Sequence, residues 1–278
     1  MTNSYCGGYW ATFTLTLLFP PVYCAQSCKR PNFSPDYHSM KWLLLTATGI
    51  TLFGGFRRPL LATGILLELA YLAIRGMDLG RLPLIGPHDT LVFFSTSIGI
   101  MALPFLFVPS LRDTELFPWL TGFTVAFFAL LSLPFPAFAM PMPPILNTLW
   151  FELHVALAFF AYALFAIGAL LGILFLKDGH RHLLDLQYKA ALVGYSFFSA
   201  SMVSGGIWGY YAWGTYWLWT PKELWTSILW LFYTLYLHLR LKGSSWERAV
   251  AWGGIVGFGI TLFTYLGVSI LMKSSHSF

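Results

Sequence analysis

Aromatic side chains are concentrated in one stretch of the chain, from Ser204 to Trp225, which reads SGGIWGYYAWGTYWLWTPKELW. Five of the chain's twelve Trp residues lie in it: Trp208, Trp213, Trp217, Trp219 and Trp225. Aromatic rings offer large flat surfaces on which another planar group can stack. The stretch therefore predicts an aromatic platform for a large planar ligand with a polar edge, and haem is the leading candidate.

Two of the seven histidines flank this stretch and could bind the iron of such a ligand. His154 lies near the start of an apolar run, and His276 follows the end of the last one. Imidazole is the commonest metal ligand in proteins, and haem iron accepts an axial ligand on each face. We predict His154 and His276 as the axial pair of a haem b. A single histidine so placed would instead indicate an interfacial residue bonded to water or backbone.

The other histidines leave alternatives open. His238 follows Trp225 by thirteen residues, which is about 20 Å along an α-helix. It could ligate a second haem inside the membrane, or it could form a hydrogen bond to a neighbouring helix. His180 and His182 lie among charged residues and predict a solvated loop, with a weak metal site as the alternative.

Composition predicts the fold class. The chain is 57% hydrophobic and 10% charged, with a mean hydropathy of +0.68. Soluble domains hold about 25% charged residues, so we predict an all-α polytopic transmembrane helical bundle in a lipid bilayer. Eight strong apolar runs have the length of spans: 40–56, 59–75, 90–109, 116–138, 150–176, 190–210, 224–241 and 249–271.

A ninth apolar run at 9–25 is weaker, because Pro20 and Pro21 interrupt it. No basic region precedes it, so we expect no cleaved signal peptide. We divide the chain into an N-terminal apolar segment and loop at 1–39 and a membrane domain at 40–278, whose external Trp-rich loop covers 205–224. Cys6, Cys24 and Cys28 form no Cys-x-x-Cys-His site and are expected to be small packing residues, with a metal site or disulfide as the alternative.

The distribution of basic residues predicts the orientation, since Lys and Arg favour cytoplasmic loops. Three loops carry them: Arg57 and Arg58; Lys177, Arg181 and Lys189; and Arg240, Lys242 and Arg248. With eight spans, these loops share one side, which we expect to be cytoplasmic. The Trp-rich loop then faces the periplasm, cell exterior or lumen. This asymmetry accounts for the net charge of +5, so we expect no nucleic-acid partner.

The chain resembles a known family over about residues 68–278. The residues that carry the resemblance are Gly80–Leu84 with Phe93-Phe94, Leu153–Val155 with Ala161–Ala163, Leu184–Tyr188, Trp208, the signature Ala212–Glu223, Tyr236–Arg240, Phe263–Val268 and His276–Phe278. On these residues the chain is similar to the haem-handling cytochrome c assembly proteins of the CcsA/ResC type.

The resemblance implies a role in cytochrome c biogenesis. It implies that Trp208, Trp213, Trp217 and Trp219 hold haem at the outer face with His154 and His276 on the iron, and that His238 marks an earlier position within the membrane. Haem would be delivered to apocytochrome c at a Cys-x-x-Cys-His segment, as part of a haem lyase or synthase. A CcsB/ResB-like membrane subunit would supply a second membrane histidine, for which His38 and His88 are internal substitutes. The location would be a bacterial inner or thylakoid-type membrane.

One position departs from the family signature, which has Asp where this chain has Thr220. Threonine keeps an oxygen that can cap a helix but loses the charge, and Glu223 could partly replace the missing acid. Lys222, and Arg81 if its loop folds over the site, could screen a haem propionate. The departure favours two alternatives: a haem-b-binding membrane subunit of an electron-transfer complex, or a HemX-like regulator of haem synthesis. No residue is singled out as catalytic.

Overall fold

The structure, a computed structural model, describes residues 36–137 and 142–272. Within these ranges the chain forms helices and no strands, and several helices are long and apolar. The predicted helical membrane bundle is therefore confirmed. The ninth apolar run at 9–25, the three cysteines and His276 lie outside the described residues.

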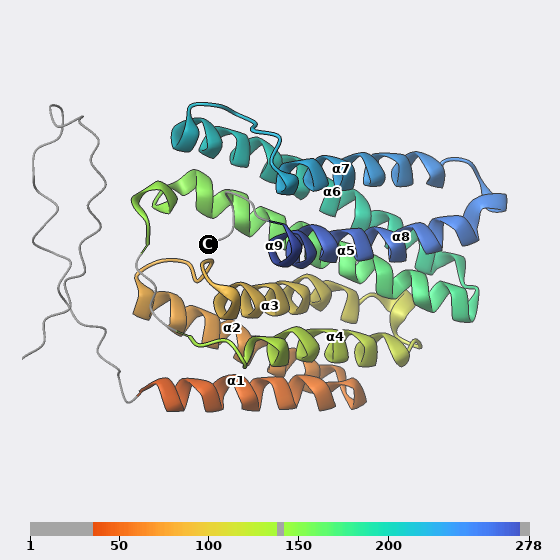
Figure 1. Cartoon of the computed structure of the whole chain (residues 1–278). Helices are drawn as coiled ribbons and strands as arrows, with labels where there is room; N and C mark the ends of the chain where they lie inside the picture. Colours follow the sequence, from red (N-terminus) through yellow and green to blue (C-terminus); the bar gives the residue numbers. More distant parts are fainter. Residues whose placement is uncertain (1–35, 138–141, 273–278) are drawn as a thin grey trace, which may run out of the picture. The chain divides into compact units, whose positions relative to one another are not determined.

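The helices follow one another in an up-and-down arrangement (Figure 1). Their bounds are α1 Asp36–Phe53, α2 Arg58–Leu79, α3 Pro87–Leu106, α4 Leu116–Ser132, α5 Leu149–Asp178, α6 Arg181–Trp213, α7 Pro221–Arg240, α8 Glu247–Leu262 and α9 Val268–Leu271. A π-helical turn, η5 (Phe263–Gly267), joins α8 to α9. Short 3-10 turns are η1 (Gly54–Phe56), η2 (Pro109–Leu111), η3 (Pro144–Leu146) and η4 (Ser244–Trp246).

Five helical segments are long and apolar enough to cross a membrane. They are α2, α3, α5, α6 and the continuous stretch Ser244–Leu271. Two further apolar helices, Met40–Phe56 and Leu116–Ser132, are shorter. The predicted span at 224–241 corresponds to α7, which is not among the five because Thr, Tyr, Trp and His residues reduce its hydropathy.

Several helix boundaries differ from the predicted apolar runs, because helices end at backbone signals and not where hydropathy falls. α4 ends at Ser132 and not at 138, because Pro134 and Pro136 follow. α6 extends in both directions beyond 190–210, from Arg181 to Trp213. Residues 205–213 of the predicted external loop are consequently helical, and so are residues 221–224.

The centre of the bundle is α5, which packs along α6, α8 and α3. Large aromatic side chains fill the space between these helices. The rings of Phe165 on α5 and Tyr233 on α7 stack at 3.6 Å and 11°, and Phe94 on α3 packs against Phe159 at 5.8 Å. Because lipid provides no hydrophobic drive between helices, close van der Waals packing of this kind holds them together.

Polar pairs connect α2 to α3. The buried Arg75 guanidinium binds the Asp89 carboxylate at 3.2 Å and donates to the Ala137 carbonyl at 3.0 Å. One turn earlier on α2, Tyr71 donates to Nε2 of His88 at 2.9 Å. Since these groups are removed from water, they must satisfy one another. They fix the ends of α2, α3 and the segment after α4.

The buried Arg75–Asp89 pair provides a test of this connection between α2 and α3. Arg75→Met leaves the Asp89 charge without its guanidinium, so we expect a loss of about 3–5 kcal/mol in unfolding free energy. The double variant Arg75→Met/Asp89→Leu removes both charges and should recover part of that loss. Thermal unfolding of the detergent-solubilised protein measures both. Additive losses in the double variant would contradict the assigned pairing.

Candidate functional site

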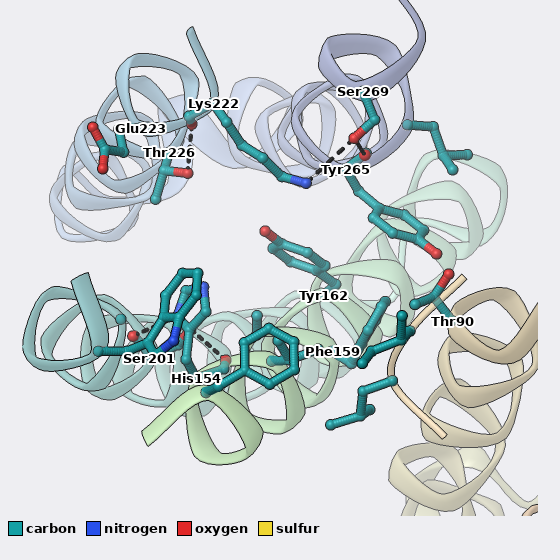
Figure 2. A pocket seen from close by; sticks show the side chains of 18 of the residues that line it. Thr90, His154, Phe159, Tyr162, Ser201, Lys222, Glu223, Thr226, Tyr265 and Ser269 are labelled. Carbon is teal, nitrogen blue, oxygen red and sulfur yellow. Dashed lines mark hydrogen bonds between the residues drawn. The ribbon is translucent and has the colours of Figure 1, made fainter. Parts of the chain in front are cut away.

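A cavity of about 510 Å³ lies at one end of the bundle. Its walls come from the start of α3, α5 and α7, the end of α6, and η5 with α9 (Figure 2). Five predicted site residues line it: His154, Trp208, Trp213, Trp217 and Lys222. Most of the other lining residues are apolar, as in typical ligand sites, which measure about 300–1,000 Å³.

His154 is held by α6. Thr148 caps the start of α5 by accepting a hydrogen bond from Phe151 N at 3.2 Å, and His154 follows in the second turn. Its Nδ1 lies 2.8 Å from the Ser201 carbonyl oxygen, and the Ser201 hydroxyl donates to the His154 carbonyl at 2.8 Å. Because a carbonyl can only accept, Nδ1 carries the hydrogen. Nε2 therefore keeps its lone pair, as a metal-ligating imidazole requires.

Trp208 and Trp213 form one aromatic wall beside His154. Trp208 is 2% exposed, and its ring lies 13° from the plane of the His154 ring at 6.4 Å. Its Nε1 donates to the Ile145 carbonyl at 2.9 Å. The Trp213 ring is inclined at 68° to the Trp208 ring. The aromatic surface is thus a set of angled walls, and the predicted flat platform is wrong.

Trp219 differs from the other three signature tryptophans. Its side chain is 71% exposed and does not line the cavity, whereas Trp217 does. Its backbone has φ 57°, a left-handed conformation that is rare for a bulky residue. This residue lies in the segment 214–220 that joins α6 to α7, where Trp217 lines the cavity and Trp219 is exposed outside it.

Thr220 and Glu223 form a capping box at the start of α7. Thr220 Oγ1 accepts from Glu223 N, and Glu223 Oε2 accepts from Thr220 N at 3.0 Å and from Leu218 N at 2.9 Å. The capping role expected of Thr220 is confirmed. One oxygen of the Glu223 carboxylate, Oε2, is therefore bound to the backbone of the loop.

His238 and His88 do not line the cavity. His238 is in the last turn of α7, about 25 Å along the helix from its start, with an exposed side chain. Its Nδ1 bonds the Thr234 carbonyl at 2.7 Å. In His88 both ring nitrogens are engaged, by Tyr71 and by the Ser132 carbonyl, so His88 is unsuited to bind iron. The side chain of His38 and all of His276 are outside the described part of the chain.

Arg81 does not line the cavity, so the predicted contact of Arg81 with a ligand carboxylate is not supported. Burial lowers the pKa of its guanidinium from the ordinary value, and the Asp89 carboxylate opposes that shift. Glu152 also lies close enough to interact with it. The rings of His180 and His182 are 5.5 Å apart, and the described residues contain no cluster of three or more metal-ligating side chains.

Ser201 and Gly205 are site residues that sequence reasoning missed. A Cβ on Gly205 would lie 2.5 Å from Nδ1 of His154, so only glycine lets the imidazole approach α6 this closely. Ser201, Gly205 and Gly209 recur at intervals of four residues, which places them on one face of a helix. This row of small residues is the sequence pattern that could have indicated a close approach of another helix to α6.

The capping box gives a test of the Thr220 position. Thr220→Asp retains a side-chain oxygen at the cap, so we expect its unfolding free energy to stay within about 0.5 kcal/mol of wild type. Thr220→Val keeps the shape without the oxygen and should lose about 1 kcal/mol. Denaturant unfolding in detergent micelles distinguishes the two. A Val variant as stable as wild type would show that the cap contributes nothing.

Comparison with known proteins shows the family to which the chain is similar. The family model described as "Cytochrome C assembly protein" matches residues 84–276. The cytochrome c biogenesis protein CcsA of Chlamydomonas reinhardtii is 32% identical over 80% of this chain and 67% of its own length. CcsA of Synechococcus sp. (strain RCC307) is 27% identical over 77% of this chain and 81% of its own.

A solved structure shares the fold. The cytochrome c heme lyase CcmF superposes with a TM-score of 0.57 at 17% identity, over 81% of this chain and 48% of CcmF. This chain therefore spans about half the length of that protein. The family match covers well over half of the chain, and the aligned residues include the cavity walls from α3 to α9. The chain belongs to the cytochrome c assembly protein family.

Proposed function

We propose that this protein binds haem b in the cavity beside His154 and delivers it for covalent attachment to apocytochrome c. The observation that carries the proposal is the His154–Ser201 contact, which leaves Nε2 with a lone pair in a cavity lined by Trp208, Trp213 and Trp217. Tyrosine and tryptophan walls suit a porphyrin face, and the fixed tautomer suits its iron. Membership of the family supports cytochrome c as the destination.

His276 is the proposed second axial ligand. It follows the end of α9 by five residues, and two α9 residues, Ser269 and Ile270, already line the cavity. Five residues of extended chain reach about 17 Å, so a return of the chain end to the cavity is within reach. Ligation by two imidazoles, with water largely excluded, would set the potential of the bound iron.

His238 is the proposed ligand of an earlier haem position within the membrane. Its Nδ1 bond to Thr234 leaves Nε2 with a lone pair, and the side chain is exposed on the bundle surface. An exposed ligand would require a second protein to complete the coordination. A membrane subunit of the CcsB/ResB type is the proposed partner.

Eight membrane crossings are proposed: α1 to α7 and the stretch from α8 to α9. The 17-residue apolar stretches Met40–Phe56, formed by most of α1 with η1, and Leu116–Ser132, which is α4, reach about 25 Å, close to the thickness of the hydrocarbon core. The turns at the end away from the cavity carry the basic residues, including Arg58, Arg181 and Arg240. The cavity would then face the periplasm or lumen of a bacterial inner or thylakoid-type membrane.

In the proposed transfer, the thiols of a reduced Cys-x-x-Cys-His segment add across the two vinyl groups of the haem. Each addition breaks one S–H bond and the π bond of one vinyl group and forms one C–S and one C–H bond, so no atom is lost. The residues of this chain bind and orient the haem, limit access of water, and keep the reacting edge within reach of the segment.

The absorption spectrum of the purified protein tests the proposal. Wild-type protein should show a six-coordinate haem spectrum, and His154→Ala should lose most of it because one axial ligand is removed. His180→Ala, at the opposite end of the bundle, is the matched control and should leave the spectrum unchanged. Addition of a Cys-x-x-Cys-His peptide should convert the haem to a thioether-linked product.

Two outcomes contradict the proposal in different ways. A wild-type protein without haem after haem-replete expression would exclude the cavity as a haem site. Haem that binds through His154 but never reacts with the peptide would exclude delivery, and it would support a haem-b subunit for electron transfer or a HemX-like regulator.

A glycine pair on α6 provides a second test of His154 as the ligand. Gly205→Ala would place a methyl group against the imidazole and rotate it, so we expect haem affinity to fall about 10–100-fold. Gly206→Ala is the matched control, because its nearest neighbour would be 3.6 Å from the added Cβ. Haem titration followed by the Soret band measures both variants. Equal affinities for the two variants would argue against ligation by His154.

A further inference from the structure

Lys222 is a cation in the cavity wall that has no acidic partner in the part of the chain that the structure describes. Its Nζ donates to Ser269 Oγ at 3.3 Å, on α9. The ion pairs among the described residues are Arg75–Asp89, Arg181–Glu247 and Arg240–Asp185, so Lys222 belongs to none of them. The adjacent Glu223 points in the opposite direction, as Figure 2 shows, toward the loop backbone that it caps.

The position of the Lys222 ammonium group, at the start of a helix and in the cavity wall, is electrostatically unfavourable. It is the second residue of α7, and the positive end of the helix dipole disfavours a cation in the first turn. The helix cap itself is the neutral Thr220 hydroxyl. The nearby polar lining residues, Tyr162, Thr226 and Ser269, are hydroxyls without charge. A half-buried cation in a mainly apolar cavity needs a counter-charge. The acidic side chain among the described lining residues is Glu223, whose Oε2 accepts from the loop backbone and which forms no ion pair with Lys222.

We propose that Lys222 is the anion-recognition group of this cavity and binds a carboxylate on the edge of its ligand. The inference rests on the proposed function and adds a ligand class to it: a planar tetrapyrrole that bears free carboxylates. An ammonium group has three N–H donors, and Ser269 takes one of them. The other two N–H groups can donate to a carboxylate while the hydrogen bond from Lys222 to Ser269 on α9 is kept.

Two separate walls would then recognise two different parts of the ligand. His154 enters from α5 and is suited to the iron at the centre of the ring, whereas Lys222 enters from α7. A ligand without carboxylates would leave the Lys222 charge buried and uncompensated, which selects against it. Contact with Lys222 also links ligand binding to α9, because Lys222 donates to Ser269 on that helix. Ser269 in turn donates to the Tyr265 carbonyl in η5 at 2.9 Å.

Metal-free porphyrins test this inference without any contribution from histidine ligation. Quenching of Trp fluorescence gives the dissociation constants of protoporphyrin IX and of its dimethyl ester, in which both carboxylates are neutral. Wild-type protein should prefer the free acid about tenfold to a hundredfold, the range expected for hydrogen bonds to a charged group. Lys222→Met should abolish the preference, and Lys222→Arg should retain most of it.

The control is Lys242→Met, which removes an exposed lysine after α7, at the far end from the cavity. Comparing ratios between variants cancels the unequal partitioning of the two porphyrins into detergent. A Lys222→Met variant that keeps the wild-type preference overturns the proposal, and so does a wild-type protein without preference. Loss of the preference in Lys222→Met together with a haem spectrum that is independent of His154 would leave this inference standing and refute the proposed iron site.

Discussion

The paired hydrogen bonds between His154 and Ser201 hold the second turn of α5 against α6, and the cavity depends on that contact. Gly205 makes it possible, because a side chain there would occupy the space of the imidazole. Once the two helices meet at this distance, Trp208 lies nearly parallel to the His154 ring. The Ser201 carbonyl thereby fixes the tautomer and the orientation of the imidazole, and the Ile145 carbonyl holds Trp208 beside it.

The turn between α6 and α7 reverses the direction of the chain beside the cavity. Gly214 ends α6 with φ 73°, and the capping box of Thr220 and Glu223 begins α7 seven residues later. Local rules are satisfied at both helix ends. They are broken by the left-handed Trp219 inside the turn and by the cation at Lys222 in the first turn of α7. Departures of this kind are typical of functional sites.

The other half of the bundle acts as a frame. The Arg75–Asp89 and Tyr71–His88 pairs between α2 and α3 satisfy one another, whereas Nε2 of His154 keeps a lone pair for a ligand. His88 illustrates the difference. Its side chain is buried, but both of its ring nitrogens are hydrogen-bonded, one to Tyr71 and the other to the Ser132 carbonyl. Residue type and burial alone do not identify a ligand; the hydrogen-bond partners do.

The sequence by itself determined the membrane class, the Trp-rich stretch and His154 as a candidate, because hydropathy and residue type are local properties of the chain. The tertiary structure decided which tryptophans face the cavity, how Glu223 is used and that Arg81 does not line the cavity. These depend on where α6 ends and how the helices are rotated about their axes, and a rotation of one residue turns a side chain by about 100°. Ser201 and Gly205 likewise acquire a role only when α5 lies against α6.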